Sequence, residues 1–347
     1  MLRTSAYRNS RRGRVYYFVT GIMLIALTSR GVRAGIHDQG IHDQGIHDQG
    51  RGIHTGWLEG PKLEGRLVAD GDRAPISLTI NGFFGDRIDG IVRDGDRAVS
   101  VRLAPSDLVG LQWTSPVCPA GRACFDARYR IVSAVRDRSK NTMPDHSDNR
   151  DVWLYQVEFI DSADPRSERW ATACPASSGR RGLFVNGRWG DNGSWHPGGY
   201  TFSCPSGVIA KCVRGWGYKP WARLPAGSQS SDGTAREIDL LPLHLACVRA
   251  ARADYCGDGT SHTRNGTLID MFDRHGLNVP EDELNFRDES AFGIAGADWV
   301  DRPRWPTGER KGERWTFPTC QRPVAISGSE RTRSLIYVRS ATLLEKR

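Results

Sequence analysis

The sequence predicts a β-rich α+β protein, built of small antiparallel sheets or a sandwich around one central helix and stabilised by disulfide bonds. Short runs of period two recur between glycine-rich turns. One alanine-rich segment has helical composition, and the cysteine count is even, at eight. We expect five parts: a signal peptide at 1–34, a flexible tether at 35–56, a β-rich part at 57–170, a cysteine-containing domain at 171–325, and a C-terminal strand and tail at 326–347.

The first 34 residues have the organisation of a secretory signal peptide. A basic segment with Arg8, Arg11 and Arg12 precedes an apolar stretch at 15–27, and Val32-Arg33-Ala34 presents small residues where a signal peptidase cleaves. The apolar stretch is shorter than the roughly 20 residues that span a membrane, so we expect cleavage and no stable membrane span afterwards. An uncleaved N-terminal anchor is the alternative. The prediction is a secreted or periplasmic protein.

Cleavage would change the charge balance. Residues 1–34 contain seven arginines and no acidic residue, and thus account for seven of the eight formal positive charges of the chain. Since the remainder is nearly neutral, net charge gives no indication of a nucleic-acid-binding surface. We expect no nucleic-acid partner.

Residues 35–49 are a threefold repeat of Gly-Ile-His-Asp-Gln, continued by a partial copy. With one apolar residue in five, this segment has little to bury, and we expect a flexible tether. The alternative is a weak transition-metal site, because imidazole is a common ligand of such metals. Its ligands would be His37, His42, His47 and His54.

The region 57–170 has the pattern of antiparallel strands. Runs with apolar and polar residues in alternation lie at 76–80, 98–103, 128–135 and 152–160. Asp-Gly and Asn-Gly pairs recur in this region and supply turns. We expect a small antiparallel sheet, a sandwich or a partial barrel.

An aromatic and glycine-rich segment occupies 174–221. Aromatic residues spaced by two, such as Tyr200 with Phe202 and Trp216 with Tyr218, lie on one side of a strand. We expect these rings to fill the core between thin β layers. A platform that binds carbohydrate is the alternative interpretation.

The segment 241–254 predicts the central helix. Pro242 suits a first turn, and Gly257 can take the positive φ that ends a helix. A helix that continues to Cys256 would place Cys247 and Cys256 about 13.5 Å apart along its axis. This is too far for a disulfide bond, so each must pair with a distant residue.

The end of this helix resembles a known family. It reads Arg252-Ala253-Asp254-Tyr255-Cys256-Gly257-Asp258-Gly259, and with His244, Cys247 and Asn265-Gly266-Thr267 around it the run is similar to the signature of the ADYC domain. Upstream, Tyr200-Thr201-Phe202-Ser203-Cys204 and Trp216-Gly217-Tyr218-Lys219-Pro220-Trp221 resemble the same family in the same order. The matched motifs cover 174–273, and the resemblance implies that the domain at 171–325 is ADYC-like. It implies an exported bacterial protein and gives no position a catalytic role.

All eight cysteines lie beyond the predicted signal peptide, and an even count in an exported chain predicts disulfide bonds. The spacing contains no Cys-x-x-Cys pair, so we expect no structural zinc site. The cysteines are Cys118, Cys124, Cys174, Cys204, Cys212, Cys247, Cys256 and Cys320.

Two of the four expected bonds are local. Cys118 and Cys124 bracket Pro-Ala-Gly, and Cys204 and Cys212 bracket Pro-Ser-Gly, so each pair would close a hairpin loop. The remaining bonds are long-range and join either of Cys174 and Cys320 to either of Cys247 and Cys256.

The loop between residues 254 and 270 carries the catalytic candidates. Asp254, Asp258 and His262, together with Asp270, could form the acid and base groups of a hydrolase. The same oxygens could bind calcium, although the alternating ligand spacing of a calcium loop is not met. Asp and Asn side chains in such turns usually hydrogen-bond to their own backbone. We expect no other cofactor.

Cys256 could instead be a nucleophile with His244 or His262 as its base, which would require an unpaired thiol. No serine-nucleophile elbow, phosphate-binding loop or dinucleotide fingerprint is present. The sequence therefore favours a non-catalytic extracellular or envelope module that binds a glycan, an envelope polymer or a protein, or has a structural role. The alternative is a hydrolase or metal-binding enzyme that uses the 254–270 loop.

Overall fold

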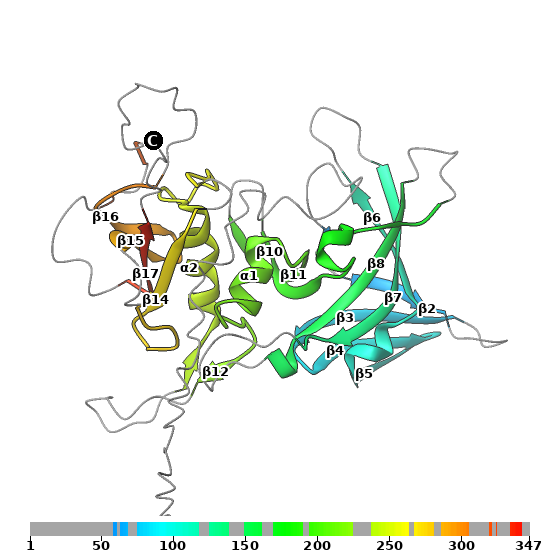
Figure 1. The fold of residues 1–347 in the computed structure, drawn as a ribbon. Coiled ribbons are helices and arrows are strands. Elements are labelled where there is room, and N and C mark those ends of the chain that lie inside the picture. Colours follow the sequence, from blue (N-terminus) through cyan, green and yellow to red (C-terminus); the bar gives the residue numbers. More distant parts are fainter. Residues whose placement is uncertain are drawn as a thin grey trace, which may run out of the picture. The chain divides into compact units, whose positions relative to one another are not determined.

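The computed structural model describes residues 58–60, 63–68, 75–117, 125–138, 149–161, 169–189, 194–224, 237–263, 267–280, 286–304, 319–320, 324 and 334–341. Within them the chain forms four antiparallel sheets and two α-helices, so the β-rich prediction is confirmed (Figure 1). Three short 3-10 helices, η2 (Pro105–Leu108), η3 (Asn149–Asp151) and η4 (Ala176–Ser178), lie between strands. No helix in these residues is long and apolar enough to cross a membrane.

The largest sheet has eight strands in the order β5-β4-β3-β2-β6-β7-β8-β9. The runs predicted at 76–80, 98–103 and 128–135 lie in β3, β5 and β7, and the run at 152–160 lies in β8 from its second residue onward. The strands are β2 (Leu63–Leu67), β3 (Ile76–Phe84), β4 (Arg87–Asp94), β5 (Arg97–Leu103), β6 (Leu111–Val117), β7 (Phe125–Arg136), β8 (Trp153–Asp161) and β9 (Ala171–Thr172).

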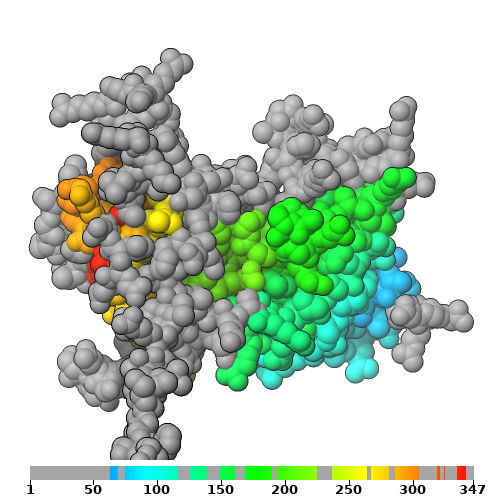
Figure 2. All heavy atoms as spheres, viewed as in Figure 1, coloured from blue at the N-terminus to red at the C-terminus, as the bar shows by residue number. Residues whose placement is uncertain are grey.

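One face of this sheet is apolar and the other is polar. In β7, Ala127, Tyr129 and Ile131 are buried, whereas Arg128, between the first two, is exposed. Successive side chains of a strand point to opposite faces, which explains this alternation. Figure 2 shows the strands of the sheet, in blue, cyan and green, contributing to the visible surface.

A three-stranded sheet contributes to two hydrophobic cores. Its strands are β1 (Leu58–Gly60), β11 (Trp195–Ser203) and β10 (Leu183–Trp189), in the order β1-β11-β10. Phe184 on β10 packs into one core with residues of the eight-stranded sheet, whereas its neighbours Leu183 and Val185 pack into a second core. The period of two along β10 thus joins both cores.

Asn186 links β10 to β3 through its side chain. Its amide oxygen accepts the backbone N–H of Phe83 (2.7 Å), and its amide nitrogen donates to the carbonyl oxygen of Phe83 (3.0 Å). Both backbone groups of Phe83 are satisfied, as buried polar groups require.

The second core contains both helices and the four-stranded sheet. Helix α2 (Leu241–Arg252) contacts α1 (Val208–Arg214) and three strands of that sheet (Figure 1). A two-stranded sheet joins β12 (Arg223–Leu224) to β13 (Ile238–Asp239). The four-stranded sheet has the order β14 (Ile269–Asp273), β17 (Ile336–Ala341), β15 (Phe286–Gly293) and β16 (Gly296–Val300).

The aromatic residues of the middle segment belong to the cores. The prediction that these rings fill the interior is confirmed, because five of them are 2% exposed or less. They are Trp189, Tyr200, Phe202, Trp216 and Tyr218. The strand expected at Trp216 and Tyr218 is wrong, because these residues follow helix α1 and lie in no strand.

Three disulfide bonds connect the six cysteines of the described residues. The expected Cys204–Cys212 pair is wrong, because helix α1 begins at Val208 and leaves no hairpin loop between them. Cys174, expected to reach the region of α2, instead pairs with the end of β11. The expectation that Cys247 and Cys256 each pair with a distant residue is confirmed. The bonds are Cys174–Cys204, Cys212–Cys247 and Cys256–Cys320.

Several predictions from the sequence lie outside the described residues. They concern the signal peptide at 1–34, the tether with its candidate histidines, and the expected bond between Cys118 and Cys124.

Candidate functional site at the end of helix α2

Helix α2 ends at a residue in the left-handed conformation. Ala253 has φ +52° and is completely buried. Its N–H donates to the carbonyl oxygen of Ala250 (3.1 Å), and the N–H of Asp254 donates to that of Arg249 (2.9 Å). These bonds satisfy the last carbonyl groups in the pattern of a Schellman motif, where glycine is the usual residue. The direction in which the chain leaves the helix is therefore set at an alanine.

Asp254 is held by a buried ion pair. Nη1 of Arg249 donates to its carboxylate at 2.6 Å, and both side chains are almost fully buried. The N–H of Gly259 also donates to this carboxylate, at 3.1 Å. Burial raises the pKa of Asp254, while Arg249 and the Gly259 amide act against that rise. Asp254 thus closes the loop 254–259 onto the helix.

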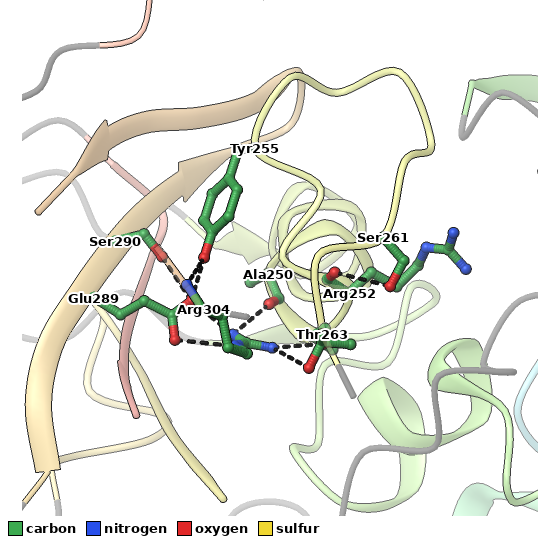
Figure 3. Close-up of polar contacts among 9 residues, drawn as sticks. Ala250, Arg252, Tyr255, Ser261, Thr263, Glu289, Ser290 and Arg304 are labelled. Atoms are coloured by element: carbon green, nitrogen blue, oxygen red, sulfur yellow. Dashed lines mark hydrogen bonds and ion pairs between the residues drawn. The ribbon is translucent and has the colours of Figure 1, made fainter. Parts of the chain in front are cut away.

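Tyr255 joins a buried polar network. Its hydroxyl donates to Oε1 of Glu289 (3.2 Å) and accepts the backbone N–H of Arg304 (2.5 Å), as Figure 3 shows. Burial, and then the Glu289 carboxylate, raise the pKa of Tyr255 well above its ordinary value. The hydroxyl is therefore neutral near pH 7 and acts there as a hydrogen-bonding group.

Arg304 uses all five of its N–H donors. Nε and Nη2 donate to the two carboxylate oxygens of Glu289, at 2.9 and 2.8 Å. Nη2 also donates to the carbonyl oxygen of Ala250, and Nη1 donates to that of Ala251 and to Oγ1 of Thr263 (Figure 3). A guanidinium has five donors, so the buried charge is fully hydrogen-bonded. Arg304 thereby caps the C-terminus of α2, where a positive charge is favourable.

Cys256 forms a disulfide bond with Cys320. The interpretation of Cys256 as a nucleophile is therefore wrong, because its sulfur carries no free thiolate. The next residue, Gly257, has φ +73°, and a Cβ there would lie 2.0 Å from the carbonyl oxygen of Ala295. The N–H of Ala297 donates to the carbonyl oxygen of Tyr255 (2.9 Å). The loop thus packs backbone to backbone against the β15–β16 turn.

Asp258 and His262 lie further along the same loop. Asp258 is exposed and accepts the N–H of Thr260 (2.9 Å), which is a turn contact. The His262 ring stacks on Tyr255, with centroids 5.5 Å apart, and its Nδ1 has no hydrogen-bond partner within the described part of the chain. Burial lowers the pKa of His262, and Asp258 acts in the opposite direction. The two side chains interact electrostatically.

The fourth acidic candidate lies apart from these residues. Asp270 is on β14 and forms an ion pair with Arg339, its cross-strand neighbour on β17. The structure therefore gathers Asp254, Asp258 and His262 on one loop and engages Asp270 elsewhere. Among the described residues, no three His, Cys, Asp or Glu side chains are grouped so as to hold a metal ion.

His244 lies in the first turns of α2, at the opposite end of the helix from Cys256. Its Nδ1 is 3.0 Å from the carbonyl oxygen of Tyr218, which requires a proton on that nitrogen. Its Nε2 is buried without a partner among the residues described. Burial lowers the pKa of His244 to about 4, so the ring is neutral near pH 7.

Comparison with protein families finds one family model that matches this part of the chain. A family model of the ADYC domain matches residues 105–306, which is more than half of the chain. The chain belongs to the ADYC domain family. The match begins at η2, inside the eight-stranded sheet, and extends past Arg304. No curated protein and no solved structure matches the chain in the corresponding comparisons.

The ADYC signature has a structural explanation in this protein. Ala253, Asp254, Tyr255 and Cys256 spell the family's name in one-letter code, and each makes a different buried connection. Ala253 ends the helix, Asp254 pairs with Arg249, Tyr255 bonds to Glu289, and Cys256 forms a disulfide bond.

Sequence reasoning missed two members of the buried polar network around Tyr255, namely Glu289 and Arg304. They lie 34 and 49 residues beyond Tyr255, in segments without a local motif. The available signal was the position of Glu289 in the apolar end of β15, since a charged residue in a buried strand needs a partner.

Proposed function

We propose that this ADYC-domain protein is an exported, non-catalytic binding module of the bacterial envelope or extracellular space. The observation that carries the proposal is that two of the candidate catalytic groups, those of Asp254 and Cys256, are engaged in structural bonds. The carboxylate of Asp254 is neutralised by Arg249 in the interior, and the sulfur of Cys256 is bonded to Cys320. A catalytic acid, base or nucleophile must instead be within reach of a substrate.

Export is supported by the disulfide bonds together with the signal-peptide pattern at 1–34. Disulfide bonds persist in oxidising compartments and are rare in the cytosol. Cleavage after Ala34 would leave a mature chain that starts at Gly35. The intact mass of the exported protein tests this, and a mass that includes 1–34 would contradict cleavage.

A hydrolase remains the second candidate because of one observation. The exposed carboxylate of Asp258 interacts electrostatically with His262, whose Nδ1 lacks a partner among the described residues. A carboxylate and a neutral imidazole on one loop are groups that acid–base catalysis uses.

One experiment separates the two candidates. The mature protein is incubated with isolated insoluble cell-envelope polymer, which is then sedimented, and both the bound protein and the released soluble sugar are measured. We expect saturable binding without release of sugar, in the wild type and in the Asp258→Asn/His262→Gln variant. Sugar release that is lost in this variant, at an unchanged Tm, would establish the hydrolase. Absence of saturable binding would overturn the binding module.

A further inference from the structure

One continuous row of side chains crosses the eight-stranded sheet from edge to edge. Each member is the direct cross-strand neighbour of the next, so the row runs perpendicular to the strands. We call it the cross-strand row. From β5 to β9 its members are Ala98, Arg93, Ser77, Arg66, Gln112, Arg130, Glu158 and Thr172.

The cross-strand row lies on the polar face of the sheet. Leu111 and Trp113, which flank Gln112 on β6, are buried in the core, and so are Tyr129 and Ile131 on either side of Arg130. Because neighbours along a strand point to opposite faces, the row points away from the core. Its members on β2 to β6 are exposed, and those on β7 to β9 are partly exposed.

Arginines occupy every second strand in the centre of the row. Arg93, Arg66 and Arg130 lie on β4, β2 and β7, and the uncharged Ser77 and Gln112 lie on the strands between them. Since adjacent strands are about 4.8 Å apart, neighbouring arginines of the row are spaced by roughly 9.5 Å. Guanidinium groups therefore alternate with hydrogen-bonding side chains along one row, which follows the twist of the sheet.

The two arginines of the row on β4 and β2 have no acidic partner within the described residues. Arg66 and Arg93 are exposed and form no ion pair there, and the same holds for Arg128, which neighbours the row on β7. Such guanidinium groups keep their donors for a ligand. The nearest carboxylate on β2 belongs to Glu64, which accepts a hydrogen bond from Thr79 (3.5 Å).

The other end of the row is rigidly built. Nε and Nη2 of Arg130 donate to Oε2 of Glu158, at 2.9 and 2.6 Å, and its guanidinium lies 4.1 Å from the ring centroid of Trp170. The pair contributes no net charge, so the charge of the row comes from Arg66 and Arg93. Trp170 adds a partly exposed indole beside the last strands.

We propose that the cross-strand row binds an extended acidic polysaccharide. Carboxylate or sulfate groups would meet Arg66 and Arg93 through charge-assisted hydrogen bonds, and sugar hydroxyls would meet Ser77 and Gln112. A continuous row of polar and cationic groups matches an extended, hydroxyl-rich anion, whereas a lipid surface would require exposed apolar anchors. This inference rests on the proposed binding function, of which it names the surface and the ligand class.

The test uses two polymers with the same backbone, dextran sulfate and neutral dextran. We expect the mature protein to bind dextran sulfate in 50 mM salt and not dextran, with affinity that falls as salt rises. Arg66→Ala/Arg93→Ala should weaken binding roughly tenfold or more. The control Arg97→Ala/Arg180→Ala removes the same charge from exposed positions outside the row, and should bind nearly as the wild type does.

Four results would overturn the inference: equal binding of dextran, no binding of dextran sulfate, equal loss in both double variants, or equally tight binding of single-stranded DNA with the same dependence on Arg66 and Arg93. Should the alanine variant lose its fold, Arg66→Gln/Arg93→Gln takes its place. If the row variant still sediments with envelope polymer as the wild type does, the inference fails alone. If the wild type does not sediment either, the proposed function fails with it.

Discussion

The guanidinium of Arg304 and the carboxylate of Glu289 face each other in the interior through two hydrogen bonds of 2.9 and 2.8 Å, with side chains 1% and 0% exposed. Arg304 also reaches the last carbonyl groups of α2, so the pair joins strand β15 to the end of the helix. Residues 253–256, the ADYC signature, thus pack beside an ion pair formed by two residues outside the signature.

Arg304→Met is expected to destabilise the fold by about 3–5 kcal/mol, because Glu289 would remain buried and charged without its partner. Urea denaturation measures this loss. The Arg304→Met/Glu289→Leu variant should be more stable than Arg304→Met alone, since it removes the orphaned charge. As a control, Arg223→Met breaks the exposed pair with Glu237 and should cost less than about 1 kcal/mol. Equal effects of Arg304→Met and Arg223→Met would contradict the role of the buried pair.

Gly257→Ala is expected to be far more damaging than Gly276→Ala. Both glycines have φ near +75°, so the backbone strain of an added Cβ is similar. At Gly257 the Cβ would lie 2.0 Å from the carbonyl oxygen of Ala295, whereas at Gly276 nothing lies within 4 Å. The difference in Tm between the two variants, measured by thermal unfolding, reports the contribution of the close contact between the loop and the β15–β16 turn. Similar Tm values would show that the loop does not require this contact.

Stability is expected to fall as the pH is lowered from about 6.5 to about 4, partly because of His244. The pKa of His244 is lowered by burial to about 4, from 6.5 in the unfolded chain. The unfolded state therefore binds the proton first, and acid favours unfolding by up to roughly 3 kcal/mol for this group. His262 and His275, whose pKa values burial also lowers, act in the same direction.

His244→Gln should flatten this dependence, since glutamine can still donate to Tyr218 and does not titrate. The measurement is the free energy of unfolding of both proteins between pH 4 and 7. Parallel curves would exclude His244 as a source of the acid sensitivity.

Peptide mapping without reduction is expected to link Cys212 to Cys247 and Cys256 to Cys320. Replacing Cys256 and Cys320 by serine should destabilise the fold by roughly 4 kcal/mol in the chain-entropy description, because the bond closes a loop of 64 residues. A peptide that links Cys204 to Cys212, or alkylation of Cys256 without reductant, would contradict the pairing.

Local patterns predicted the elements of this fold that have local causes. The start of α2 follows from Pro242, and its end, at Arg252, was predicted within two residues because glycines follow it. Helix α1 was missed, since its seven residues are too few for an amphipathic period to emerge between Cys204 and Cys212. The error in disulfide pairing followed directly from that omission.

The relationships that define the candidate site and the cross-strand row are not local. Tyr255 meets Glu289 although 34 residues separate them, and Glu289 lies where the register of β15 against β17 shifts, between Asp288 and Ser290. Such irregularities change the direction of a side chain. Arg66, Arg93 and Arg130 are far apart in the sequence and align only through four successive strand pairings. Net charge could not reveal this alignment, because it averages over the whole surface.

Strand β17 lies between β14 and β15 in the four-stranded sheet, yet its residues, Ile336–Ala341, come after the part of the chain that matches the family. At the other limit, residues 105–306 omit β1 to β5. A fragment cut at 105 and 306 would expose the edges of β14, β15 and β6, and unpaired strand edges promote aggregation. The part of the chain that matches the family is therefore smaller than the set of strands that pair in the structure, and recombinant work on this protein should retain β1 to β17.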